Sequence, residues 1–180
     1  HVTIVDRSLD VLRRLDNQFG NRIQTLYSTQ DAVEEMAMKA DLIIGAVLIP
    51  GASAPKLITR DAVKSMSSGT AMVDVAIDQG GCFETSHATT HDEPTYIVDD
   101  VVHYCVANMP GAVARTSAAA LNNATLPYVL ALANHGIFCA LRNDPHLMNG
   151  LNVHEGKITN KFVAAAHELE YVSPAQAGLI

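Results

Sequence analysis

Two acidic residues stand where a carboxylate could do chemistry. Asp78 follows the apolar run Ala71–Ile77, which only Asp74 interrupts, and it precedes Gly80 and Gly81. An open α/β sheet presents ligand-facing groups at the carboxyl ends of its strands, and glycines there permit positive φ and close backbone approach. Asp78 is therefore a candidate functional carboxylate. An ordinary turn aspartate before two glycines would give the same pattern.

The second acid is Asp6, which ends the β-branched stretch Val2–Val5. A third candidate is the histidine pair His87 and His91, in the polar segment Glu84–Glu93. Two histidines four residues apart could ligate a metal, but no strong third ligand is near and the segment lacks a helical pattern. We therefore interpret it as a solvated loop and predict no metal site.

An alternation of strands and helices must position these residues. Strands are predicted at residues 2–5, 22–27, 41–47 and 71–77, and helices at 9–19, 31–39 and 61–66. Further short strands are predicted at 95–98 and 102–106, and Ile49-Pro50-Gly51-Ala52 is predicted to form a loop. Strands alternating with helices through short connections indicate a parallel, doubly wound sheet of the α/β class.

The ends of the first four strands would border one crevice. They carry Asp6, Ser28, Val47-Leu48 and Asp78. In dinucleotide-binding sheets of the Rossmann type, an acid after the second strand binds the adenosine ribose. Asp6 is predicted to do so, which favours NAD, although Arg7 beside it could pair with the 2′-phosphate of NADP.

The glycine fingerprint of such a sheet should precede that acid by about 20 residues. The chain starts too late to include it and opens directly in a strand without a methionine. We therefore expect a fragment whose sheet lacks its first strand and glycine loop.

From Arg115 onward the βα alternation stops. Helices are predicted at 116–133, with a kink at Pro127 and an end at His135-Gly136, and then at 137–142 and 161–169; a hairpin is predicted at 151–159 and a loose tail at 171–180. The expected organisation is a truncated nucleotide-binding domain at 1–114 and a mainly helical segment at 115–180.

Composition limits the possible functions. The chain has 180 residues, 48% of them hydrophobic, and a net charge of −7. No basic surface is available for phosphates, so nucleic acid is not an expected partner. No uninterrupted apolar run reaches the length of about 18 residues that a membrane span needs, so no membrane span is expected. The three widely spaced cysteines fit reduced thiols in the cytoplasm.

Three longer motifs carry a resemblance to a known family. They are residues 40–57, 73–84 and 104–110, and the similarity continues through His154-Glu155-Gly156. The whole chain resembles the C-terminal half of the alanine dehydrogenases, a family shared with the NAD(P) transhydrogenase α subunit. Asp78 in Ile77-Asp78-Gln79-Gly80-Gly81 resembles the dehydrogenases, because the transhydrogenases lack an aspartate in this place.

The resemblance implies an activity and an architecture. The family's enzymes catalyse reversible oxidative deamination of L-alanine to pyruvate and ammonia with NAD, and they are usually homohexamers. Their nucleotide domain is inserted into a substrate domain, so the segment from Arg115 onward would be the returning part of the substrate domain.

The resemblance also assigns roles to single residues. Asp6 would hold the adenosine ribose, Ser28 would contact the adenine side, and Val47 and Leu48 would line the adenine–ribose cleft. Ile77 and Asp78 would lie at the nicotinamide, with Asp78 at the catalytic centre, and Val106, Asn108 and Met109 would pack around the nicotinamide and its ribose.

A carboxylate at the catalytic centre could stabilise an iminium charge and orient or deprotonate water. The family's catalytic histidine, lysine and arginine match no residue here, so the chain alone is expected to show no turnover and poor NAD affinity. Two alternatives stay open. One is an NAD(H)-binding module of a transhydrogenase, coupled to a membrane partner, and the other is a non-catalytic nucleotide-binding or oligomerisation fragment.

Overall fold

The computed structural model describes residues 1–49 and 53–179, so Pro50, Gly51 and Ala52 of the predicted loop lie outside the described residues. The chain forms two compact units. The first consists of His1–Leu48 and Ser53–Met109, and the second of residues 110–179 with Ile49. Each unit is described by itself.

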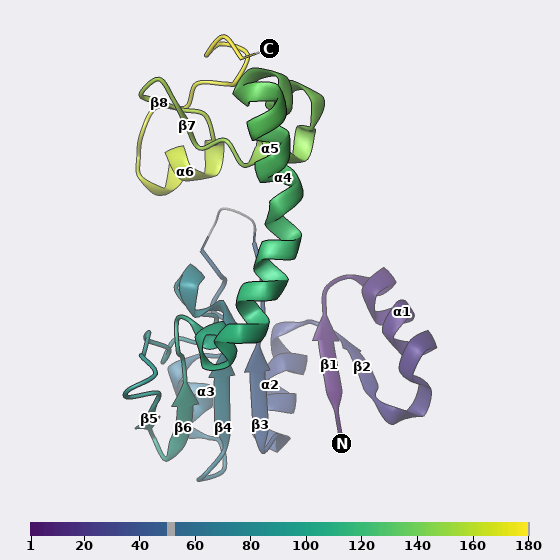
Figure 1. The fold of residues 1–180 in the computed structure, drawn as a ribbon. Coiled ribbons are helices and arrows are strands. Elements are labelled where there is room, and N and C mark those ends of the chain that lie inside the picture. Colours follow the sequence, from purple (N-terminus) through teal and green to yellow (C-terminus); the bar gives the residue numbers. More distant parts are fainter. Residues whose placement is uncertain (50–52, 180) are drawn as a thin grey trace. The chain divides into compact units, whose positions relative to one another are not determined.

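The first unit alternates strands and helices, which confirms the predicted α/β class (Figure 1). Its elements are β1 (Thr3–Asp6), α1 (Leu9–Phe19), η1 (Gly20–Arg22), β2 (Gln24–Tyr27), α2 (Gln30–Lys39), β3 (Leu42–Gly45), α3 (Arg60–Lys64), β4 (Ala71–Asp74), η2 (Val75–Gln79), β5 (Thr95–Val98) and β6 (Val101–Tyr104). The side chains of Ser8, Thr29 and Thr59 accept from backbone N–H groups at the starts of α1, α2 and α3. Each satisfies a donor that the helix cannot pair internally.

The strands form two sheets. β1 and β2 pair in parallel, and the larger sheet has the order β3-β4-β6-β5, with β3, β4 and β6 parallel and β5 antiparallel to β6. In a doubly wound sheet, the second and fourth strands of the fold flank the first. In the predicted order, β1 is the second strand of the fold and β3 is the fourth. Without the first strand between them they cannot pair with each other, and in the structure they do not.

The core of the first unit lies mainly beside β4. Met72 on β4 and Val63 on α3 are fully buried, and they pack with Ile58, Phe83 and Val101. By contrast, Ile44 on β3 is 62% exposed. β3 therefore keeps an open apolar surface even though its pairing with β4 is complete along Leu42–Gly45.

The second unit is mainly helical, as predicted. It contains η3 (Met109–Val113) except for its first residue, which belongs to the first unit. It also contains α4 (Ala114–Asn143), α5 (Pro145–Asn149), β7 (Val153–His154), β8 (Lys157–Ile158) and α6 (Lys161–Ala166). Within α4 the non-helical backbone is at Gly136, with φ 71° and ψ 163°, where the sequence predicts a helix end. The backbone at Pro127, where a kink was predicted, stays helical.

The prediction of a loose tail was wrong for residues 171–179. Leu179 is fully buried in a cluster with Leu141 and Ala177. Its carbonyl also accepts a hydrogen bond from Arg142 Nε at 2.7 Å. Apolar packing and a charge-assisted bond together fix the tail.

Within the described ranges, one helical stretch, Met109–Asn143, is long and apolar enough by length and composition to cross a membrane. This stretch contains no uninterrupted apolar run of that length, because small polar residues such as Ser117, Asn122 and Thr125 interrupt it. A core helix of a soluble protein passes the same test.

Candidate functional site

The turn that carries Asp78 is built by the end of β4. The strand stops at Asp74, three residues earlier than predicted, because the Asp74 side chain accepts the Ala76 N–H at 3.1 Å and caps the 3₁₀ turn η2. Gly80 ends that turn with φ 86°. A left-handed residue costs an L side chain energy that glycine does not incur, so the predicted role of Gly80 is confirmed.

Asp78 lies on the exposed side of this turn. Its neighbour Ile77 is buried, whereas Asp78 is exposed. In the described part of the chain its carboxylate makes no hydrogen bond or ion pair. The structure thus fixes the backbone of Asp78 and leaves both carboxylate oxygens available to a ligand.

Asp74 is a fully buried carboxylate below the same turn. Besides Ala76, it accepts from the Cys82 N–H at 2.8 Å, the Ser86 hydroxyl at 2.5 Å and the Cys82 thiol at 3.4 Å. A buried charge is stable only when hydrogen bonds replace its hydration. Asp74 therefore joins the end of β4 to the segment that follows the two glycines.

Asp6 and Ser28 lie together at the ends of β1 and β2. The Ser28 N–H donates to the Asp6 carbonyl at 3.0 Å. Asp6 Oδ1 accepts the Ser8 N–H at 2.7 Å, which turns the chain into α1. No hydrogen bond within the described ranges involves Asp6 Oδ2, so that oxygen can accept from an incoming hydroxyl.

The apolar candidates follow the parallel strands β3 and β6. Val47 packs against the main core, and Leu48 is 73% exposed. Val106 is buried beside β6.

The chain then exposes Asn108, whose carbonyl accepts from His91 Nε2 at 2.6 Å, and reaches the half-buried Met109 at the start of η3. Because the arrowheads of β1, β3, β4 and β6 point the same way in Figure 1, the strand ends carry the predicted residues to one edge of the first unit.

The polar loop between Gly81 and Pro94 is ordered by contacts that the sequence did not reveal. His87 stacks on Tyr96 with ring centroids 3.7 Å apart, and His91 binds the Asn108 carbonyl. Among residues 1–49 and 53–179, no group of three or more His, Cys, Asp or Glu side chains could hold a metal ion.

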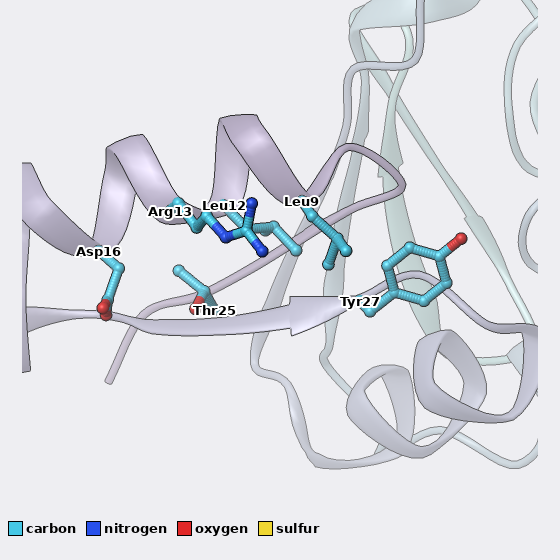
Figure 2. Close-up of a pocket in the computed structure, with 6 residues that line it drawn as sticks. All are labelled: Leu9, Leu12, Arg13, Asp16, Thr25 and Tyr27. Carbon is cyan, nitrogen blue, oxygen red and sulfur yellow. The ribbon is translucent and has the colours of Figure 1, made fainter.

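A surface hollow of about 260 Å³ lies elsewhere, between α1 and β2. Figure 2 shows that Leu9, Leu12 and Arg13 from α1 and Tyr27 from β2 line it, together with Asp16 and Thr25. None of the predicted site residues does. We place the candidate site at the strand ends, because the hollow offers no carboxylate on a glycine turn.

Cys82 is held as a neutral thiol under the Asp78 turn. Burial, reinforced by the nearby Asp74 charge and the hydrogen bond to it, raises the pKa of Cys82 to about 12. Since the thiolate is the reactive form, iodoacetamide at neutral pH should label exposed Cys139 and spare Cys82 and Cys105. Peptide mass spectrometry would check this, and early Cys82 labelling in folded protein would contradict it.

Comparison with known proteins agrees with this geometry. The family described as "Alanine dehydrogenase/PNT, C-terminal domain" matches residues 1–161. Alanine dehydrogenase of Halomonas elongata is 62% identical over 97% of this chain and 47% of its own length. That of Mycolicibacterium smegmatis is 54% identical over 98% of this chain and 47% of its own length. The chain thus spans about half the length of the curated relatives it matches.

Among solved structures, an alanine dehydrogenase is more similar to this chain than a transhydrogenase is. A structure titled "L-alanine dehydrogenase" superposes with a TM-score of 0.82 at 48% identity, over 93% of this chain and 46% of that one. A transhydrogenase from Sinorhizobium meliloti gives 0.55 at 27% identity, over 64% of this chain and 32% of that one. Together with the strand-end carboxylates, these matches show that the chain belongs to the alanine dehydrogenase/PNT C-terminal domain family.

Proposed function

We propose that this chain is the dinucleotide-binding part of an NAD-dependent L-alanine dehydrogenase. Residues 1–114 form the nucleotide-binding domain, and residues 115–180 form a returning segment of the substrate domain. The reaction is the reversible oxidative deamination of L-alanine to pyruvate and ammonia. The observation that carries the proposal is the exposed Asp78 carboxylate, which has no hydrogen-bond or ion-pair partner among the described residues, on a turn fixed by Asp74 and Gly80.

The residues at the strand ends suit a nicotinamide dinucleotide. Asp6 has one carboxylate oxygen held by Ser8 and the other available, which suits the two hydroxyls of a ribose. Ser28 lies beside it, and Val47 and Leu48 offer apolar surface to an adenine. Ile77, Val106, Asn108 and Met109 would adjoin the nicotinamide end, where the bound cofactor supplies a hydride acceptor.

Asp78 would then act on the substrate and on water. Loss of hydride from the alanine Cα leaves a positively charged imine, which a nearby carboxylate stabilises. Water attacks that carbon, and Asp78 can accept the proton that the water loses. Return of this proton to the amine nitrogen lets the C–N bond break, so that ammonia leaves as the carbonyl of pyruvate forms and the hydroxyl proton is released. In the reverse direction the same carboxyl group returns the proton.

A chimera tests the proposal. The matching region of the Halomonas elongata enzyme, covered at 62% identity, would be replaced by this chain and assayed for NADH formation from L-alanine. We expect alanine-dependent turnover from the chimera and none from the isolated chain. A correctly folded chimera without activity would contradict the proposal.

Asp6 gives a prediction about cofactor affinity. Asp6→Asn keeps an oxygen that can accept the Ser8 N–H but removes the charge. Since a hydrogen bond to a charged group is worth about 1.5–3 kcal/mol, NAD affinity of the chimera should fall by about 10–150-fold. Isothermal titration calorimetry would measure this, with Asp10→Asn, on the exposed surface of α1, as control. Unchanged NAD affinity in the Asp6→Asn variant would remove Asp6 from the site.

The same titrations with NADP test whether Arg7 makes the site prefer NADP in spite of the Asp6 charge. We propose NAD as the preferred cofactor, because the Asp6 charge repels a 2′-phosphate. A cytoplasmic homohexamer completes the proposal, and mass photometry of the chimera would test the assembly.

The transhydrogenase module is the second candidate, and the Sinorhizobium meliloti structure at 27% identity favours it. The higher identity to alanine dehydrogenases supports the first candidate. A chimera that oxidised alanine normally after Asp78→Ala would reverse that preference. Absence of any thermal shift with NAD would instead favour the non-catalytic fragment.

A further inference from the structure

We propose that Lys56 is a positioning residue that holds the Asp78 turn in its working conformation. The inference rests on the proposed function only in taking Asp78 as the catalytic carboxylate. The motif around Lys56, Ala54-Pro55-Lys56-Leu57, carries part of the family resemblance but has no role in the site described so far.

The Lys56 ammonium binds the backbone just beyond Asp78. Its Nζ donates to the carbonyls of Gly80 at 2.6 Å, Gly81 at 2.8 Å and Phe83 at 3.2 Å. An ammonium has three donors, so these carbonyls use all of them. Lys56 thus has a defined task in the described structure that does not involve a carboxylate.

The backbone on either side of Lys56 is hydrogen-bonded to residues 79–84, which include the carbonyls that Lys56 binds. The Ala54 N–H donates to the Gln79 carbonyl at 3.0 Å, the Leu57 N–H to the Cys82 carbonyl at 2.7 Å, and the Glu84 N–H to the Ile58 carbonyl at 3.0 Å. Residues 54–58 therefore lie alongside residues 79–84 as a short ladder, and Lys56 adds a side-chain contact in its middle.

Asp74 binds a backbone N–H group of the segment whose carbonyls Lys56 binds. Its buried carboxylate takes the Cys82 N–H, while Lys56 takes the carbonyls of Gly80 and Gly81. Gly81, with φ 76°, lies close against Asp74, since an added Cβ would lie 2.8 Å from Asp74 Oδ2. An anion and a cation thus bind the N–H and C=O groups of one turn from two sides.

This arrangement matters for Asp78 because no hydrogen bond or ion pair within residues 1–49 and 53–179 holds its side chain. Its direction is set by the backbone of η2 and of the two glycines, both of which have positive φ. Glycines are otherwise the most flexible residues of a chain. Without the Lys56 contacts, the turn would sample other conformations, and the carboxylate would spend less time at the reacting carbon.

Lys56→Met tests the proposal in the chain itself, because it removes the charge and keeps much of the apolar stem. Hydrogen exchange followed by mass spectrometry should show faster exchange at residues 79–84, by about tenfold or more, as a lost charge-assisted bond implies. Lys64→Met is the matched control, since Lys64 is an exposed lysine whose one ion pair among the described residues is with Asp61 at 3.1 Å. Lys56→Arg, which can still donate to carbonyls, should restore part of the protection.

The chimera supplies the functional readout. Lys56→Met should lower kcat by about tenfold or more while the KM for NAD stays within about twofold, and Lys56→Arg should recover part of kcat. Unchanged exchange at residues 79–84, or unchanged kcat in a chimera that Asp78→Asn inactivates, would overturn the role of Lys56 and leave the proposed function intact. A chimera without alanine oxidation would count against the proposed function alone, and the exchange data would still decide whether Lys56 holds the turn.

Discussion

Asp78→Asn should reduce kcat of the chimera by a factor of about 10²–10⁴, the range for losing a positioned general acid or base. The amide keeps the shape of the side chain but loses the charge that stabilises the imine and accepts a proton from water. Steady-state kinetics in both directions would measure the loss. Because the Asp78 carboxylate makes no hydrogen bond or ion pair within the described chain, stability should not change.

The control for this variant is an exposed carboxylate outside the site. Asp61→Asn, which changes an exposed side chain of α3, should leave kcat unchanged. The NAD affinity of Asp78→Asn should also stay near that of the unmodified chimera, since the ribose is assigned to Asp6. If kcat of Asp78→Asn stays within about twofold of the reference, Asp78 is an ordinary turn aspartate before two glycines.

The two glycines after Asp78 should respond very differently to alanine. Both have positive φ, 86° for Gly80 and 76° for Gly81, so each alanine costs about 1–2 kcal/mol of backbone strain. At Gly80 no atom lies within 4 Å of the added Cβ, whereas at Gly81 it meets Asp74 Oδ2 and the Ser86 Cβ at 2.8 Å. Overpacking adds about 1–3 kcal/mol, so Gly81→Ala should be clearly the less stable variant.

Urea denaturation followed by circular dichroism would compare the two variants, since the chain has no tryptophan to report by fluorescence. Gly80→Ala is the internal control because it carries the same strain without the contact. Equal destabilisation by the two changes would mean that Asp74 does not lie against Gly81 in solution.

Much of the fold could be predicted because its signals are local. Ser8 before α1 and Thr59 before α3 are capping residues next to apolar helical patterns, and both helices begin there. The alternation of strand and helix identified the parallel α/β class without any long-range information. Gly136, predicted as a helix end, is indeed the non-helical residue of α4.

The errors have one physical cause, which is contact between distant residues. The strand before Asp78 was predicted to reach Ile77, since hydrophobicity alone cannot show that Asp74 turns back to cap η2. The tail was predicted to be loose, since nothing near Leu179 in the sequence announces Leu141 as its neighbour.

The candidate site was predicted in part for the same reason. Asp6 and Asp78 stand out locally, as acids at the ends of apolar strands. Lys56 does not, because its partners are backbone carbonyls 24 to 27 residues away, which no side-chain pattern records. Asp74 gave one usable signal, as the only charged residue inside an otherwise apolar run.

One edge each of β1 and β3 pairs with no strand in the part of the chain that the structure describes, which has a consequence for work with the isolated chain. Each strand has one hydrogen-bonded neighbour in its sheet, β2 for β1 and β4 for β3, and apolar Leu42 and Ile44 lie exposed on β3. A free edge with apolar side chains recruits strands from other molecules. Purified samples should therefore scatter more light as they are concentrated, and dilution should reduce the scattering.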